Sequence, residues 1–277
     1  MMMRRQSQGK NFIIGDNDRL SDLPNAILLH IMSFMKIKDA VQTCILARGW
    51  KDLWKSLPNL TLHTSDFRKP SLFSEFVSGI VSSRDGNHPL HNLDFDRHGY
   101  FKPQILTNLI RYAVLHDIQH LKIYVPCNIS LPWCVFSCQT LKSLHITDAS
   151  YDVKKRTRIP KSLKLPALVS LHLANVPIFA DDNGYAEPFS TCTKLNTLFI
   201  DKFALVPPNS HILRMPGILN ITNATLANLT INVTYNPGYK FVISTPNLSS
   251  FTLNGSPFQP LRGQEGVNVE LQSSSLI

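Results

Sequence analysis

The feature that most constrains this chain is a recurring triplet of apolar residues, written apolar-x-x-apolar-x-apolar. The middle apolar residue of each copy falls at Leu60, Leu93, Leu121, Leu144, Leu171, Leu198, Leu229 and Phe251. Successive copies are separated by 33, 28, 23, 27, 27, 31 and 22 residues. Because this many copies at similar spacing indicate internal repetition, the pattern predicts stacked structural repeats with inserted loops of unequal length.

In an extended strand, the two apolar residues of L-x-L point to one side and the residue between them points to the other. A single unit cannot bury its own leucines, so stacked units share a core behind a parallel sheet. A period of roughly 20 to 29 residues is that of leucine-rich repeats. Helical spacing predicts helices in the connections at 71–82 and 104–116. The later connections are rich in Pro, Asn and Asp, and we expect loops and short turns there.

A different pattern occupies residues 18–60. Leu23-Pro24 is expected to open a helix, because proline suits the first helical turn. Apolar residues between Ile27 and Met35 then fall on more than one face, which exceeds the single stripe of an ordinary surface helix. A second helix is expected from Asp39 and a third short helical piece around Trp50 and Trp54. A segment of about forty residues rarely sustains its own core, so this apolar surface predicts a partner or docking onto the rest of the chain.

Residues 18–60 resemble the F-box of plant proteins that pair this motif with leucine-rich repeats. The matching residues are Asp18-Arg19-Leu20-Ser21, Leu23-Pro24, Ile27, His30-Ile31, Ser33-Phe34, Lys38-Asp39-Ala40-Val41, Thr43, Leu46, Arg48, Trp50, Leu53-Trp54 and Leu57-Pro58-Asn59-Leu60. The segment departs from the family at Lys36-Ile37 and at Gly49. The repeats resemble the same family at Leu131-Pro132, Leu165-Pro166 and Thr245-Pro246-Asn247-Leu248.

The resemblance implies an α/β fold in which a three-helix F-box precedes a short, irregular leucine-rich-repeat solenoid with a parallel sheet. The expected organisation is a disordered tail at 1–16, the F-box at 17–57, repeats at 58–258 and a C-terminal tail at 259–277. Such proteins often carry a further C-terminal FBD domain. We expect none here, because the final residues do not continue the repeat.

The resemblance also implies a function as a non-catalytic adaptor of a cullin-RING ubiquitin ligase. The F-box is expected to bind a Skp-type linker protein, and through it cullin, while the repeats hold an unknown protein substrate. For the linker contact we predict an apolar set comprising Leu23, Pro24, Ile27, Ile31, Leu46, Trp50 and Trp54.

For substrate binding we predict His145, His172 and Phe199. They are the outward-pointing residues of three consecutive, equally spaced units, and we expect them to form one contiguous concave patch. A phenylalanine at such a position suits a partner surface. The alternative is that the loop at 181–188 folds over Phe199 and covers it.

Two other functions stay open, a small-molecule (hormone) co-receptor and a ligase-independent scaffold or nucleic-acid binder that uses the net charge of +9. The densest basic run, residues 154–158 with Lys161 and Lys164, fits either a nuclear import signal or a solvated loop.

We expect no catalytic residues, cofactor or metal. The sequence has no P-loop or G-x-S-x-G motif, and neither the His116/His120 pair nor the Asp94/Asp96 pair forms a recognisable site. Five cysteines without a C-x-x-C pair predict neither a disulfide framework nor a zinc finger. We expect no membrane span and a location in the nucleus or cytoplasm.

Overall fold

The computed structural model describes residues 23–45, 48–84, 86, 88–98, 102–125, 131–149, 157–206, 217–233, 239–255 and 268–271. The predicted disordered tail at 1–16 lies outside these residues, as do residues 154–156 of the basic run. The chain divides into two compact units, Met1–Trp54 and Lys55–Ile277. Among the described residues, no helix has the length and apolar character needed to cross a membrane.

The first helix described in the first unit is α1 (Asn25–Ser33), which begins directly after Pro24 as predicted. The helix α2 (Ile37–Gln42) and the 3₁₀ turn η1 (Thr43–Ile45) follow. In place of a third α-helix, the structure has two 3₁₀ turns, η2 (Arg48–Trp50) and η3 (Leu53–Ser56). Between them, Asp52 has a φ of 66°. Because a continuous right-handed helix does not allow a positive φ, the two turns remain separate.

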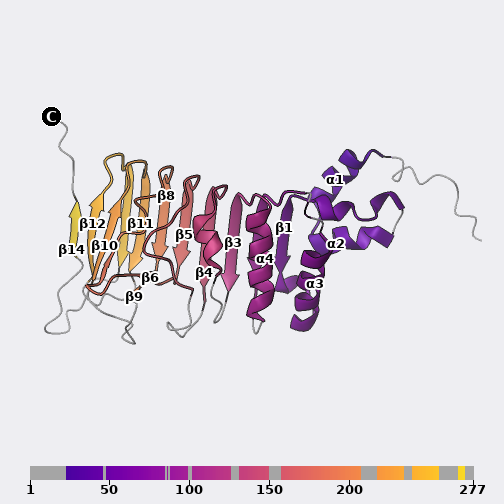
Figure 1. Cartoon of the computed structure of the whole chain (residues 1–277), viewed down its shortest axis with the longest axis horizontal. Helices are drawn as coiled ribbons and strands as arrows, with labels where there is room; N and C mark the ends of the chain where they lie inside the picture. Colours follow the sequence, from indigo (N-terminus) through magenta and orange to yellow (C-terminus); the bar gives the residue numbers. More distant parts are fainter. Residues whose placement is uncertain are drawn as a thin grey trace, which may run out of the picture. The chain divides into compact units, whose positions relative to one another are not determined.

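The main sheet of the second unit contains eight parallel strands (Figure 1). Each coincides with one copy of the sequence repeat. In spatial order they are β1 (Asn59–His63), β2 (Asn92–Asp96), β3 (His120–Val125), β4 (Ser143–Asp148), β5 (Ser170–Ala174), β8 (Thr197–Asp201), β11 (Asn228–Val233) and β13 (Ser250–Gly255).

The register of this sheet keeps the repeat in phase from the first strand to the last. Leu60 pairs with Leu93, which pairs with Leu121, and the same position continues through to Phe251. Equivalent residues of all eight units therefore form rows across the sheet. The predicted strand positions and their parallel arrangement are confirmed.

The first connections between the strands are helical. The helix α3 (Pro70–Ser83) follows β1 and the turn η4 (Thr64–Asp66), and the helix α4 (Pro103–Leu115) follows β2. Both helices begin at a proline and lie where helical spacing predicts them. The next connection contains the 3₁₀ segment η5 (Trp133–Ser137).

The later connections were expected to be loops, and this expectation is wrong for part of them. Together with one strand in the segment expected as the C-terminal tail at 259–277, their strands form two further parallel sheets (Figure 1). One sheet pairs β6 (Ile178–Phe179) with β9 (Leu205–Val206). The other has the order β14 (Asn268–Leu271), β12 (Tyr239–Ser244), β10 (Gly217–Thr222) and β7 (Tyr185–Ala186). The strands β10 and β12 form because alternating residues bury apolar side chains, namely Leu219, Ile221, Phe241 and Ile243.

The core of the second unit lies between the main sheet and these connections. The inward residues of the repeat, from Leu60 to Ile231, are at most 1% exposed. The ring of Phe73 in α3 lies 5.7 Å from that of Phe95 in β2, which places α3 on the inner side of the sheet. Burying each such side chain contributes about 1.5–3 kcal/mol. The residue between the two apolar residues of each strand is left on the opposite side, which we call the outer face.

Candidate partner-binding surfaces

The helix α1 has one buried side and one apolar side that is open to solvent. Leu28 and Met32, four residues apart, are fully buried. Pro24, Ile27, Ile31 and Phe34 follow one another at intervals of three or four residues along another side. Ile27 is 46% exposed and Phe34 is 79% exposed, whereas Ile31 is half-buried. We call these four residues the α1 stripe, and the ring of His30 contacts Phe34 edge-on at 5.0 Å.

The other predicted linker-contact residues have different environments. Leu23 is half-buried next to Pro24, and Leu46 lies outside the described residues. Trp50 and Trp54 are only 5% and 6% exposed, so their rings belong to the packed interior of the folded chain. Their part in linker binding stays a prediction.

Sequence reasoning did not select Phe34 or Ile45, which is 87% exposed, as contact residues. For Phe34 the signal was available, because apolar residues between Ile27 and Met35 occupy more faces than a core requires.

The outer face of the main sheet brings together the three predicted substrate-binding residues. The register pairs His145 with His172 and His172 with Phe199. The rings of His145 and His172 lie 3.8 Å apart between centroids at an interplanar angle of 12°. Those of His172 and Phe199 lie 4.1 Å apart at 10°. Three half-buried rings therefore form one continuous stack, which we call the ring stack.

The loop at 181–188, the alternative cover for Phe199, forms part of another sheet instead. Its residues Tyr185 and Ala186 form β7, which pairs with β10. The side chain of Asp181 accepts hydrogen bonds from the backbone N–H groups of Asn183 and Tyr185, at 3.0 and 2.8 Å. These hydrogen bonds hold the loop in the conformation that pairs β7 with β10. The ring of Phe199 stacks on that of His172.

Burial controls the protonation of the two histidines in the ring stack. The pKa of His145 is lowered to about 4, chiefly by partial burial and further by His172 and Lys122, against an opposing effect of Asp94. Burial also lowers the pKa of His172. Near neutral pH both rings are therefore uncharged, and they stack without electrostatic repulsion. His145 Nε2 lies 3.2 Å from Thr147 Oγ1, so one ring nitrogen is engaged on the same strand.

A hollow of about 260 Å³ adjoins the ring stack on the outer face. It is lined by Asn92, Leu93, Asp94, His120, Leu121, Lys122, Ser143 and His145. Two of its residues form an ion pair, with Lys122 Nζ 3.1 Å from Asp94 Oδ2, and His63 Nε2 of the neighbouring strand lies 3.3 Å from Asp94 Oδ1. The hollow therefore offers hydrogen-bonding groups and an ion pair rather than a surplus of one charge.

The residues of the candidate metal and acid–base pairs have other neighbours in the described part of the chain. His116 directly follows α4, and its ring stacks on that of Tyr112 with the centroids 3.9 Å apart, while His120 begins β3. Asp94 pairs with Lys122, and Asp96 lies 3.4 Å from His98. No group of three or more His, Cys, Asp or Glu side chains suited to a metal occurs among the described residues.

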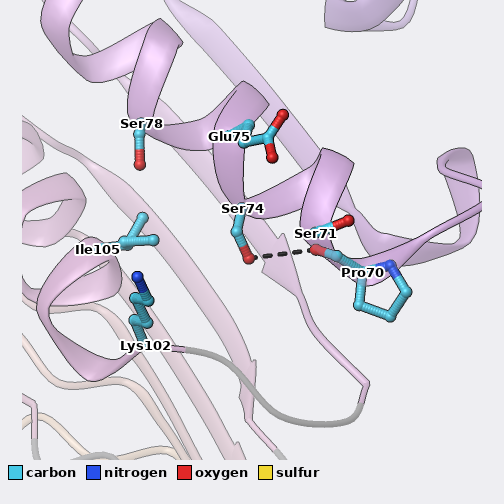
Figure 2. A pocket seen from close by; sticks show the side chains of 7 residues that line it. All are labelled: Pro70, Ser71, Ser74, Glu75, Ser78, Lys102 and Ile105. Carbon is cyan, nitrogen blue, oxygen red and sulfur yellow. Dashed lines mark hydrogen bonds between the residues drawn. The ribbon is translucent and has the colours of Figure 1, made fainter.

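A larger hollow, of about 680 Å³, lies between α3 and α4. Figure 2 shows Pro70, Ser71, Ser74, Glu75 and Ser78 of α3 along one side, with Lys102 and Ile105 across from them. Ser74 Oγ donates a hydrogen bond to the carbonyl of Pro70 at 3.1 Å. Sequence reasoning did not predict this hollow, because it depends on how far apart the two helices lie.

Comparison with known proteins bears on the N-terminal segment and on the chain as a whole. The model of the F-box domain matches residues 20–62. A putative FBD-associated F-box protein of Arabidopsis thaliana is 32% identical over 241 residues, which cover 83% of this chain and 54% of the relative. A putative F-box/FBD/LRR-repeat protein of the same plant is 27% identical over 256 residues, covering 91% and 56%.

A third relative, F-box/LRR-repeat protein 13 of Arabidopsis thaliana, is 25% identical over 251 residues, covering 86% of this chain and 54% of that protein. The chain thus spans about half the length of these curated relatives. No solved structure matches the chain.

Proposed function

We propose that this chain, a member of the plant F-box/leucine-rich-repeat family, is a substrate-recognition adaptor of an SCF-type cullin-RING ubiquitin ligase. In this function the F-box binds a Skp-type linker, and through it cullin, while the repeats bind a protein substrate. The adaptor itself performs no covalent chemistry. It raises the effective concentration of a substrate lysine near the ubiquitin-charged enzyme and orients it.

The observation that carries the proposal is the α1 stripe within the matched F-box segment. An apolar side of a short helix that stays open to solvent costs solubility unless a partner covers it. Ile27 and Phe34 are the strongest candidates for energetic anchors, because they are apolar and exposed in the unbound chain. Leu23, Ile31, Leu46, Trp50 and Trp54 complete the proposed linker-contact set, the buried tryptophans by supporting it from within.

The ring stack and the adjoining hollow support substrate binding by the main sheet. We interpret the eight in-phase strands as leucine-rich repeats, whose outer residues are free to vary without disturbing the core. His145, His172 and Phe199 offer a rigid, uncharged aromatic surface, and the hollow is large enough for one or two side chains. A nuclear or cytoplasmic location completes the proposal, since the four described cysteines are free thiols.

The proposal is tested by measuring the affinity of the purified full chain for a plant Skp-type linker by calorimetry. The Pro24→Ala/Ile27→Ala variant is expected to lose at least about 2 kcal/mol of binding free energy, or about 30-fold in Kd. Phe34→Ala should also weaken binding, and its high exposure means that folding does not depend on it.

Leu72→Ala is the matched control, because Leu72 is 47% exposed on α3, outside the F-box. It should bind the linker like the wild type. If Pro24→Ala/Ile27→Ala and Phe34→Ala both retain wild-type affinity, the linker does not use the α1 stripe.

A second candidate function, small-molecule-dependent recognition, is favoured by the hollow between α3 and α4. Its volume of about 680 Å³ falls within the range of roughly 300–1,000 Å³ typical of ligand pockets. A thermal-shift screen of plant small molecules tests this candidate. A stabilising compound whose effect disappears in Ser78→Trp, which fills the hollow, supports it, and a screen without such a compound counts against it.

A further inference from the structure

A third surface, separate from the outer face, is built around an exposed tryptophan. Trp133 in η5 is 62% exposed, whereas Trp50 and Trp54 are buried. Its ring stacks on that of Phe179 in β6, with centroids 6.4 Å apart and an interplanar angle of 12°. The Trp133 ring also contacts the ring of Phe136 edge-on, with the centroids 6.2 Å apart. A large aromatic side chain held in place yet open to solvent indicates an interaction site.

Backbone hydrogen bonds fix the elements that carry these rings. The N–H of Ile159 donates to the carbonyl of Pro177 at 2.8 Å, and the N–H of Phe179 donates to the carbonyl of Ile159 at 2.9 Å. The N–H of Lys164 donates to the carbonyl of Phe136, also at 2.8 Å. The segment from 157 to 165 is therefore tied to both β6 and η5, and it brings the end of the basic run to the aromatic rings.

Basic residues lie on the segments that carry or adjoin the rings. The guanidinium carbon of Arg158 lies over the ring of Phe179, 5.4 Å from its centroid. Lys161 and Lys164 are exposed, and Arg111 of α4 is close enough to Cys134, the neighbour of Trp133, to act on it electrostatically. In the sequence, Lys154, Lys155 and Arg156 come just before this segment. We call the surface formed by Arg111, Trp133, Arg158, Lys161, Lys164 and Phe179 the Trp133 patch.

We propose that the Trp133 patch is a second docking surface, which binds an acidic protein segment in which Asp or Glu residues flank an apolar side chain. The apolar side chain packs on Trp133, and the carboxylates pair with Arg158 and the lysines. A guanidinium matches a carboxylate through two parallel hydrogen bonds, and Trp and Arg are the residues most enriched at the energetic centres of protein interfaces.

Charge also distinguishes this partner from a nucleic acid. Asp181 and Asp182 follow Phe179 by two and three residues, and Asp182 is exposed. A continuous phosphate backbone meets repulsion from these carboxylates, whereas a peptide can place its few acidic residues away from them. The patch shares no residue with the α1 stripe, the ring stack or its hollow. It therefore provides a contact beyond those that the adaptor function uses.

The test begins with a displayed library of random peptides panned against the purified full chain. The enriched sequences are expected to combine several Asp or Glu residues with an apolar residue. A synthetic peptide of the enriched sequence is then titrated into the chain while tryptophan emission is recorded. Because Trp133 is the exposed one of the three tryptophans, binding should shift the emission to shorter wavelength and protect it from acrylamide quenching.

The Trp133→Ser/Arg158→Gln variant is expected to bind the peptide about ten-fold or more weakly. Wild-type affinity should also fall as salt rises. Leu72→Ser/Lys69→Gln is the matched control, since it removes an exposed apolar side chain and an exposed cation outside the patch, and it should bind like the wild type. Thermal melts of each variant establish that it is folded.

The proposal is overturned by any of three results. The first is a library without acidic enrichment. The second is unchanged peptide affinity in a folded Trp133→Ser/Arg158→Gln variant. The third is tighter binding of an oligothymidylate, or of phosphatidylserine vesicles, than of the selected peptide at the same patch, which assigns the surface to a nucleic acid or a membrane instead.

Discussion

The ring stack makes the stability of the second unit depend on pH. The perturbation is a change from about pH 7 to about pH 5, which crosses the range where an unfolded histidine takes up a proton. In the folded chain the pKa of His145 is lowered to about 4 from an ordinary value of 6.5, chiefly by burial. Between these two values the unfolded chain binds the proton and the folded chain does not. The free energy of unfolding therefore falls as the pH falls.

The size of the effect follows from the same two values. The full difference between 6.5 and about 4 corresponds to about 3.4 kcal/mol, of which roughly half develops between pH 7 and pH 5, because the folded chain takes up its proton only near pH 4. The ring is only about half-buried, so solvent screening reduces this to about 1 kcal/mol. Neighbouring His172 contributes in the same direction, because burial also lowers its pKa.

Urea unfolding at the two pH values measures the effect, with His145→Phe as the comparison. Phenylalanine does not titrate, and Phe199 shows that it fits the stack. The variant should lose about 1 kcal/mol less than the wild type between pH 7 and pH 5. Because groups away from the ring stack titrate equally in both proteins, the difference between them reports His145 together with its coupling to His172. Equal losses in the two proteins would refute the account of the ring stack.

Three further predictions concern the core. Arg84 is 5% exposed and donates hydrogen bonds to the carbonyl of Leu57 at 2.8 Å and to Tyr112 Oη at 3.2 Å. Arg84→Met should therefore lower the free energy of unfolding by about 2 kcal/mol, and an unchanged melting temperature would contradict this. In urea unfolding, Leu198→Ala should lower the free energy of unfolding by about 3 kcal/mol, and Val169→Ala, at a 43% exposed site, by less than about 1 kcal/mol. Equal losses in the two variants would contradict the assignment of Leu198 to the core. Burial raises the pKa of the Cys192 thiol to about 11. Mass spectrometry should therefore find Cys192 alkylated more slowly at mildly alkaline pH than half-exposed Cys134, and equal alkylation rates of the two thiols would argue against the burial of Cys192.

The main sheet and the ring stack could be predicted because both follow from local periodicity. Once L-x-L alternation and parallel stacking are assumed, equal spacing alone places His145, His172 and Phe199 side by side. The second and third sheets could not be predicted in the same way. In 217–222 and 239–244 the apolar residues Ile218 and Val242 blur the alternation, and Pro and Asn residues around these segments favour loops.

Exposure was harder to predict than secondary structure. Trp50 and Trp54 look like partner anchors in the sequence, yet both are buried, whereas Trp133 is exposed without any distinctive local pattern. The difference arises from tertiary packing, which a sequence window does not contain. The replacement of the third helix by 3₁₀ turns depends likewise on one backbone angle, at Asp52.

Affinity purification from plant cells, with protease inhibition and mass spectrometry, tests the adaptor function most directly. The wild-type chain should retain the linker, cullin and at least one further protein. His172→Ala/Phe199→Ala should keep the linker and cullin but lose that protein. Pro24→Ala/Ile27→Ala should lose the linker and cullin but keep that protein. A wild-type chain that retains neither linker nor cullin, or a His172→Ala/Phe199→Ala chain whose partners are all unchanged, would contradict the assignment of these two surfaces.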